Sequence, residues 1–301
     1  MEKLRKYCLD ELKDKNFDRL AVAVLDFKNF TFDALEFENG REVQVGAAVF
    51  DLASLTKPLT LGLAFQLFPA DFSIDQILLL EHRGGLPSWG RLSRSDWKEQ
   101  VLSYPISKSK TLYSDFSALR LMLDLESKWG ESIYQRLSSH WDGELKNWLD
   151  LDSKLHCPVT GWRNGHPIQG DVHDDNAFVI NERVSHAGLF SNINSLARTL
   201  IDFDQNNHLL ENMLKEDWAV AERFIKGWDR PTDLERTLAG KGCSKETFGH
   251  LGFTGTSIWI DARTKKGHII LTNETKKYWY DRAKINEFRR NVGEMIWNDQ
   301  I

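Results

Sequence analysis

Residues 50–60 read Phe50-Asp51-Leu52-Ala53-Ser54-Leu55-Thr56-Lys57-Pro58-Leu59-Thr60, and the rest of the chain is interpreted outward from them. This stretch places a hydroxyl and an amine three residues apart in an apolar run. If a helix begins at Ser54, Lys57 lies one turn further on the same face, within reach of the Ser54 hydroxyl. Pro58 favours that start, because proline cannot donate a hydrogen bond to the carbonyl four residues back, which is that of Ser54. The stretch therefore predicts a nucleophile beside its base.

The tetrad Ser-x-x-Lys is weak evidence by itself, because it occurs three times, at residues 54–57, 95–98 and 107–110. Ser95 follows a charged loop and is typical of a helix cap, and Ser107 lies in a polar connection. Only Ser54 has apolar residues on both sides, as a site inside a cleft requires. The alternative, in which Ser54 caps a helix and Lys57 lies at the surface, stays open at this point.

Composition is that of an ordinary soluble globular protein, with 41% hydrophobic and 28% charged residues among 301. The net charge of −5 gives no electrostatic reason to expect nucleic acid or an anionic membrane as a partner. Cys8, Cys157 and Cys243 are odd in number and lack metal-like spacing, which indicates a reducing compartment. The first residues do not resemble a signal peptide, and no run approaches about 18 apolar residues. We therefore expect a cytoplasmic protein that acts on a small molecule without an obligate protein partner.

Hydrophobic periodicity predicts strands near both ends of the chain and helices between them. Expected helices span residues 3–15, 59–68, 96–104, 114–128, 131–140, 195–204, 211–224 and 285–296, and expected strands span residues 20–27, 30–37, 250–260 and 268–272. The segment 157–192 is polar and aperiodic, as a cleft wall would be. We predict an α/β fold of the α+β type, with one antiparallel sheet, helices at both termini and a helical insertion. Residues 1–301 would form a single domain, with an α/β part (about 1–58 and 245–301) and a helical part (about 59–244).

Two further segments supply candidate partners for Ser54. Tyr113-Ser114-Asp115 begins a predicted helix, so its polar residues could simply cap that helix. In the functional interpretation, a neighbouring ammonium lowers the pKa of Tyr113, which shuttles protons, and Asp115 orients Lys57. Gly252 and Gly255 could let substrate lie against a strand edge whose free N–H stabilises an oxyanion, or could only mark a turn.

Other chemistry is less well supported by the sequence. His173, Asp174, Asp175 and His186 are metal-binding residue types without metal-like spacing, so neither a metal nor a cofactor is expected. A Ser/His/Asp triad that used His186 or His250 would leave Lys57 without a role. Eleven tryptophans could line a groove for a ligand, although most tryptophans belong to protein cores.

The ordered motifs resemble those of the β-lactamase-related serine hydrolases, which include class C β-lactamases, D-alanyl-D-alanine carboxypeptidases and esterases. The resemblance rests on Phe50–Lys57, Tyr113-Ser114-Asp115, His250-Leu251-Gly252, the Leu80–Pro87 stretch, and Val172–Ala177 with His186–Ser191. It spans about residues 20–275 and implies a β-lactamase/transpeptidase-like fold.

This resemblance also implies roles for individual residues. Ser54 would be acylated, Lys57 would act as general base, and Tyr113 would assist proton transfer. The backbone N–H groups of Ser54 and Phe253 would form the oxyanion hole. We place the substrate against five further residues: Trp89, Asp115, His186, His250 and Gly252.

Three departures from the family pattern occur, of which the first two shift the expected substrate and the third is expected to change the wall of the cleft. His250-Leu251 replaces Lys-Thr, Asp115 replaces asparagine, and Asn181–Ser185 replaces a glycine-rich run. A neutral imidazole binds a carboxylate less well than an ammonium does. We therefore expect an esterase-like hydrolase, with action on β-lactams, D-Ala-D-Ala or muropeptides as the alternative. A binding or sensing module without catalysis is the alternative of another class.

Overall fold

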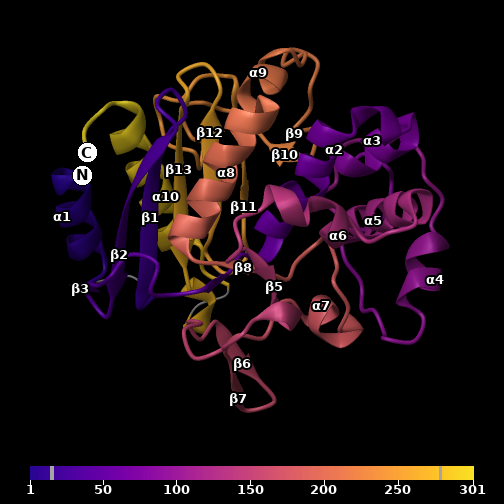
Figure 1. Cartoon of the computed structure of the whole chain (residues 1–301), viewed down its shortest axis with the longest axis horizontal. Coiled ribbons are helices and arrows are strands. Elements are labelled where there is room, and N and C mark those ends of the chain that lie inside the picture. The colour runs from indigo at the N-terminus through magenta and orange to yellow at the C-terminus, as the bar shows by residue number, and fades with distance from the viewer. Residues whose placement is uncertain (14–16, 278–279) are drawn as a thin grey trace.

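The computed structural model describes residues 1–13, 17–277 and 280–301. Its largest sheet has eight antiparallel strands, and strands from the two ends of the chain lie side by side within it (Figure 1). β1 (Arg19–Asp26) pairs along its length with β13 (Lys266–Thr272). The predicted antiparallel sheet completed by both ends is therefore confirmed.

The strands follow in the order β3-β2-β1-β13-β12-β11-β10-β9. The remaining members are β2 (Thr31–Glu38), β3 (Arg41–Glu42), β9 (Phe224–Ile225), β10 (Trp228–Asp229), β11 (Thr247–Leu251) and β12 (Ser257–Asp261). The helix predicted over 211–224 was wrong beyond residue 214, because α9 (Leu209–Leu214) ends there and β9 begins at Phe224. Lys226 and Gly227 have φ angles of 47° and 89°, and this two-residue turn returns the chain as β10. These strands fall within the residues that we assigned to the helical part.

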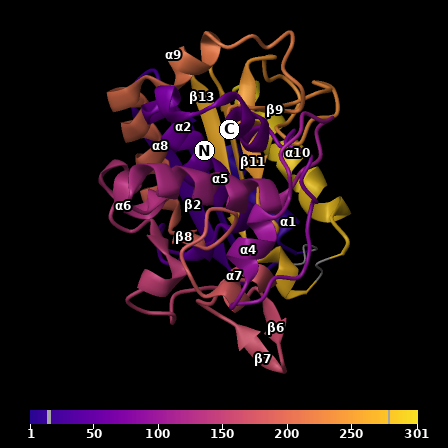
Figure 2. The ribbon, with the colours of Figure 1, turned by 90° about the vertical axis from the view of Figure 1, so that its right-hand side faces the viewer.

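Both faces of the sheet are covered by helices (Figures 1 and 2). Side chains alternate between the faces of a strand, so Leu20 and Val22 pack with the terminal helices α1 (Glu2–Glu11) and α10 (Ala283–Trp297). Ala21 and Ala23 face the opposite way, into the core shared with α8 (Ile193–Asn207). The predicted opening helix extended to residue 15, and its last two residues lie outside the described part of the chain.

The remaining helices surround the other half of the molecule. They are α2 (Leu63–Leu67), α3 (Ile74–Leu80), α4 (Trp97–Leu102), α5 (Asp115–Trp129), α6 (Ile133–Leu137) and α7 (Asp175–Ile180). We did not predict α3, although Ser73 and Gln76 form a capping box at its start. The segment expected to be aperiodic contains α7 and a hairpin of β6 (Gly161–Arg163) and β7 (His166–Ile168), which projects from the body (Figures 1 and 2).

A second, three-stranded sheet joins distant segments beside Ser54. β4 (Phe50–Asp51) pairs with β8 (Leu189–Ser191), which also pairs with β5 (Lys146–Asn147). After β4 the chain makes a 3₁₀ turn over Ala53–Leu55 and then a π-helical turn over Pro58–Gly62 before α2. Pro58 lacks the N–H that a regular α-helix needs at this position, which accounts for the departure from α-helical geometry.

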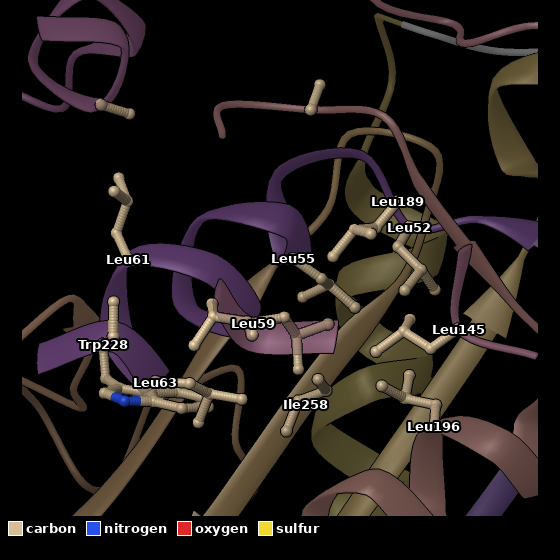
Figure 3. Packing of buried hydrophobic residues seen from close by; sticks show 14 of the residues in the cluster. Leu52, Leu55, Leu59, Leu61, Leu63, Leu145, Leu189, Leu196, Trp228 and Ile258 are labelled. Atoms are coloured by element: carbon tan, nitrogen blue, oxygen red, sulfur yellow. The ribbon is translucent and has the colours of Figure 1, made fainter. Parts of the chain in front are cut away.

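Apolar side chains hold this segment in place. Leu52, Leu55 and Leu59 belong to one buried cluster with Ile258 of β12 and Leu189 of β8 (Figure 3). Burying a leucine side chain contributes about 1.5–3 kcal/mol to folding. The apolar flanks that distinguished Ser54 in the sequence therefore anchor its turn between the large sheet and the helices.

Candidate active site

Ser54 lies on a sharp turn whose conformation Asp51 supports. Ala53 has a φ of 48°, a left-handed conformation that costs an L-residue about 1–2 kcal/mol. Asp51 Oδ1 accepts a hydrogen bond from the Ala53 N–H at 2.8 Å, and Asp51 Oδ2 accepts one from the His173 N–H at 2.7 Å. Burial raises the pKa of Asp51 to about 7, although these two N–H groups oppose the shift. The turn that presents Ser54 is thus tied to the segment that precedes α7.

Lys57 sits directly behind Ser54 and is 3% exposed. Its Nζ lies 3.1 Å from Ser54 Oγ, 2.9 Å from the His186 carbonyl oxygen and 2.7 Å from Asp115 Oδ1. These three acceptors match the three N–H bonds of an ammonium. Burial lowers the pKa of Lys57, but the Asp115 carboxylate and the Tyr113 hydroxyl outweigh burial and hold that pKa above its ordinary value. In the resting protein Lys57 is therefore an ammonium.

Tyr113 completes the group around the nucleophile. The centre of its ring lies 4.9 Å from Lys57 Nζ, and its hydroxyl is hydrogen-bonded to the Lys57 and Ser54 side chains. Burial raises the pKa of Tyr113 more than the Lys57 ammonium lowers it. The expected lowering of this pKa was therefore wrong, and the resting tyrosine is a neutral phenol that can donate a proton.

The residues at the start of α5 both cap this helix and position the side chains around Lys57. Ser114 Oγ caps the helix by accepting a hydrogen bond from the Ser117 N–H at 2.9 Å. The Ser114 N–H donates to His82 Nδ1 at 3.2 Å, and the His82 ring lies 4.8 Å from the Tyr113 ring. Burial lowers the pKa of His82 well below its usual value, which suits a ring nitrogen that accepts. Ser114 thus fixes the backbone while its two neighbours reach Lys57.

The turn that follows β11 is fastened to the Ser54 segment by two threonines. Thr254 Oγ1 donates to the Asp51 carbonyl at 2.7 Å, and Thr256 Oγ1 donates to the Leu52 carbonyl at 3.1 Å. Gly252 has no room for a side chain, because a Cβ would lie 1.9 Å from Thr256 Oγ1. Close packing therefore requires a glycine at this position, where we also predicted contact with the substrate. Within the described residues the Phe253 N–H has no hydrogen-bond acceptor, as an oxyanion donor requires.

Two cavities meet at Ser54, and Tyr113 and Phe253 line both of them. The larger one, of 830 Å³, is here named the aromatic cavity because Trp89 and Trp162 also line it. The smaller one, of 320 Å³, is named the arginine cavity. Its charged and polar lining includes Arg223, Asp229, Arg282, Arg289, Asn286 and His250. Arg223 pairs with Asp229, and Arg282 pairs with Glu274. Ser54 can therefore be approached from two chemically different sides.

Neutral His250 supplies no charge to the arginine cavity. Its Nδ1 is 2.8 Å from the Leu251 carbonyl oxygen, and its Nε2 is buried without a partner in the described residues. Burial, with the Lys57 charge as a second cause, lowers the pKa of His250 to about 3. The imidazole that replaces a lysine thus offers a hydrogen-bond acceptor at neutral pH.

Positive charge enters this cavity from Arg289, which the sequence analysis missed. Arg289 Nη2 donates to the Thr256 carbonyl at 2.8 Å, and its Nη1 donates to Asn286 Oδ1 at 3.0 Å. Its Nε is buried and unpartnered among the described residues. Burial lowers the pKa of Arg289 to about 10, so it stays charged at neutral pH. A sequence signal was available, because Arg289 falls on the apolar face that Ile285 and Val292 define.

The predicted substrate contacts are distributed unevenly. Trp89 and Asp115 line the aromatic cavity, and His250 and Gly252 line the arginine cavity, whereas the side chain of His186 lines neither. His186 is 1% exposed, and its Nε2 lies 2.9 Å from Asp174 Oδ1. Burial raises the pKa of Asp174, but His186 outweighs burial and holds that pKa below its usual range. His186 therefore reaches the site through its carbonyl, which accepts from Lys57.

Two negative findings apply to the described residues. Within them, no group of three or more His, Cys, Asp or Glu side chains could hold a metal ion. No helix in the ranges 1–13, 17–277 and 280–301 is long and apolar enough to cross a membrane.

Comparisons with known proteins were made by sequence and by fold. The sequence profile of the family described as Beta-lactamase matches residues 77–287. The chain is 33% identical over 254 residues to an N-acetylmuramyl-L-alanine amidase of Bacillus subtilis (strain 168), covering 67% of this chain and 56% of that protein. It is 28% identical over 242 residues to a putative D-alanyl-D-alanine carboxypeptidase of Escherichia coli (strain K12), covering 65% and 56%. The chain thus spans about half the length of these curated relatives.

A structural match extends over nearly the whole chain. The fold is similar to that of a β-lactamase from Mycobacterium bovis, with a TM-score of 0.64 and 17% identity over 97% of this chain and 98% of that one. The profile match covers more than half of the chain, and it includes α5 and the turn after β11. This chain belongs to the β-lactamase family, within the β-lactamase-related serine hydrolases.

Proposed function

We propose that this protein is a serine hydrolase that forms an acyl-Ser54 intermediate, and that its substrate is an acylated amino acid or short peptide. The observation that carries the proposal is the position of Ser54 Oγ, 3.1 Å from Lys57 Nζ where the two cavities meet. A substrate amide that crosses Ser54 would extend its acyl part into the aromatic cavity. Its amino-acid part would enter the arginine cavity, where the Arg289 guanidinium would bind the carboxylate.

The proposed proton transfers balance within the three side chains. Ser54 Oγ bonds to the substrate carbonyl carbon and passes its proton to Lys57 in its minor, neutral form. Tyr113 donates its proton to the leaving nitrogen and regains one from the Lys57 ammonium. Water then attacks the ester carbonyl and loses a proton to neutral Lys57, which returns that proton to Ser54 Oγ as the ester bond breaks. Because resting Lys57 is an ammonium, the reactive fraction of the protein increases as the pH rises.

The names of the curated relatives support an amide substrate. One relative is an amidase of N-acetylmuramyl-L-alanine and the other is a putative carboxypeptidase of D-alanyl-D-alanine. Both names describe a bond to the nitrogen of an alanine, which is a bond of the proposed kind. Hydrolysis of simple esters uses the same Ser54 chemistry without the arginine cavity, and the neutral His250 favours it as the second candidate.

A covalent probe tests this function directly. A fluorophosphonate should label the protein, and peptide mapping should locate the label at Ser54. Ser54→Ala should abolish labelling, whereas Ser95→Ala and Ser107→Ala, from the other two Ser-x-x-Lys tetrads, should label as the wild type does. Two results together would instead indicate a binding module. The wild type would not be labelled, and a ligand would raise the Tm of the wild type and of Ser54→Ala equally. Turnover of nitrocefin should be slow or absent.

A further inference from the structure

Two exposed tryptophans line the aromatic cavity. Trp89 is 52% exposed and Trp162 is 64% exposed, and among the described residues no other tryptophan is as exposed as these two. Both line the same cavity, although they are far apart in the sequence. Trp89 lies in the loop before α4, and Trp162 lies in β6. Large apolar side chains exposed together mark a binding surface.

The hairpin that carries Trp162 is fastened to the body by the next residue along β6. Successive side chains in a strand point to opposite sides, so Arg163 faces away from Trp162. Arg163 Nη2 donates to the His173 carbonyl at 2.9 Å and pairs with Asp175 at 3.0 Å. Its guanidinium also lies 4.0 Å from the centre of the Phe178 ring. Trp162 is therefore presented to the cavity by an anchored strand.

Most of the charged side chains in the wall of this cavity are paired. Asp175 pairs with Arg163, Asp115 pairs with Lys57, and Lys276 pairs with Asp18. A wall with paired charges favours a neutral ligand. The same polar groups offer hydrogen bonds at the edge of the aromatic surface.

We propose that the aromatic cavity is a saccharide subsite in which Trp89 and Trp162 stack on a pyranose ring of the substrate's acyl part. A pyranose has apolar C–H groups on its faces and hydroxyls around its edge, which matches indole surfaces rimmed by Asp174, Asp175 and Lys276. Besides their present partners, the two carboxylates and the ammonium can accept from and donate to sugar hydroxyls, which a purely apolar acyl group does not offer. This assignment rests on the proposed function for its orientation across Ser54.

Binding is tested separately from catalysis in the Ser54→Ala protein. N-acetylglucosamine should bind to this variant in a titration followed by calorimetry and by tryptophan fluorescence. Trp162→Ala and Trp89→Ala, each added to Ser54→Ala, should raise the Kd at least tenfold, and Trp162→Phe should restore part of the affinity. Leu155→Ala is the matched control, because Leu155 is 84% exposed and does not line the cavity. Thermal unfolding of each variant shows whether its fold is retained.

Two outcomes would overturn the subsite. One is an absence of sugar binding by a Ser54→Ala protein whose wild-type parent is labelled at Ser54. The other is tighter binding of phenylacetamide, a neutral aromatic acyl mimic, with the same dependence on Trp162. Sugar binding by a protein that no fluorophosphonate labels would instead retain the subsite and overturn the hydrolase proposal, so the two failures are distinguishable.

Discussion

The arginine cavity and the aromatic cavity open on the same nucleophile but are built from different parts of the fold. The arginine cavity is formed by the end of β11, a strand of the large sheet, and by the first turns of α10, which packs on that sheet. The aromatic cavity is formed by the loop that contains Trp89, the β6–β7 hairpin and the turn after β13. One cavity therefore belongs to the sheet, whereas the other is assembled from connections on its rim.

This difference indicates how the two halves of a substrate are recognised. Arg289 is fixed by backbone carbonyls of the same turn that presents Phe253, so charge recognition is coupled to the oxyanion donor. Trp162 lies on a hairpin that could change in sequence without disturbing the sheet. We infer that the scaffold determines the reaction and the recognition of the substrate's amino-acid end, whereas loops determine the recognition of its acyl end.

A change to the carboxylate that holds Lys57, behind the nucleophile that both cavities share, should not discriminate between substrates. Asp115→Ala removes the carboxylate that holds Lys57 at 2.7 Å, and displacement of a catalytic group can cost about 100-fold. We expect kcat/KM to fall by at least about 100-fold, equally for an N-acyl-alanine with a free carboxylate and for a neutral ester. A loss confined to one substrate would break the comparison, because Asp115 would then act by contacting that substrate and not through Lys57.

Asp115→Asn provides the matched variant, since it retains the size of the side chain and removes its charge. The Asp115 carboxylate raises the pKa of Lys57, so its neutral replacement lowers that pKa. Activity requires neutral Lys57 and rises with pH, so the rising limb of the pH–rate profile should move to lower pH. A profile that stays in place would show that Lys57 is not the group that titrates. Asp175→Asn, in the wall of the aromatic cavity, should leave the profile unchanged.

A change inside the arginine cavity should discriminate between substrates. Arg289→Met removes the buried guanidinium, and a hydrogen bond to a charged group contributes about 1.5–3 kcal/mol. We expect kcat/KM to fall about 10- to 100-fold for N-acyl-alanine and to change little for the neutral ester. Arg290→Met, one residue further along α10, is the control because Arg290 does not line the cavity. Equal losses for both substrates would assign Arg289 to the oxyanion turn alone.

Much of the scaffold could be predicted from the sequence because its signals are local. The periodicity of α5 and α8 and the apolar runs of β1 and β13 each occur within one element. Phe224 was misassigned because a short hairpin strand is defined by its pairing partner, Trp228 in β10, and a helical pattern can extend through such a segment.

Residues of the candidate site could likewise be predicted only where their signal is local in the sequence. Ser54, Lys57, Tyr113 and Asp115 were found because each lies in a motif beside a helix start. Arg289 and Trp162 were not found, because the turn after β11 and the anchored β6 place them beside Ser54 only in three dimensions. The pKa of Tyr113 was misjudged because burial, the larger cause, cannot be read from neighbouring residues in the sequence.

His250 gives the smallest expected effect and the sharpest test of where the charge of the arginine cavity originates. Because the pKa of His250 is about 3 in the folded protein, its imidazole is neutral from pH 5 to 8 and cannot hold a carboxylate by charge. His250→Asn should therefore change the KM for N-acyl-alanine by less than about threefold, with no step near pH 6 in either protein.

Stability should respond to the same substitution in a direction that the pKa sets. An unfolded histidine takes up a proton below about pH 6.5, whereas folded His250 does not until about pH 3. The free energy of unfolding therefore falls as the pH drops from about 6.5 toward 3, and His250 contributes to that fall. In His250→Asn, urea unfolding at pH 4 and pH 7 should show a smaller difference between the two pH values than in the wild type. A KM that rises steeply above pH 6 only in the wild type would show a charged His250, and the charge of this cavity would then not come from its arginines alone.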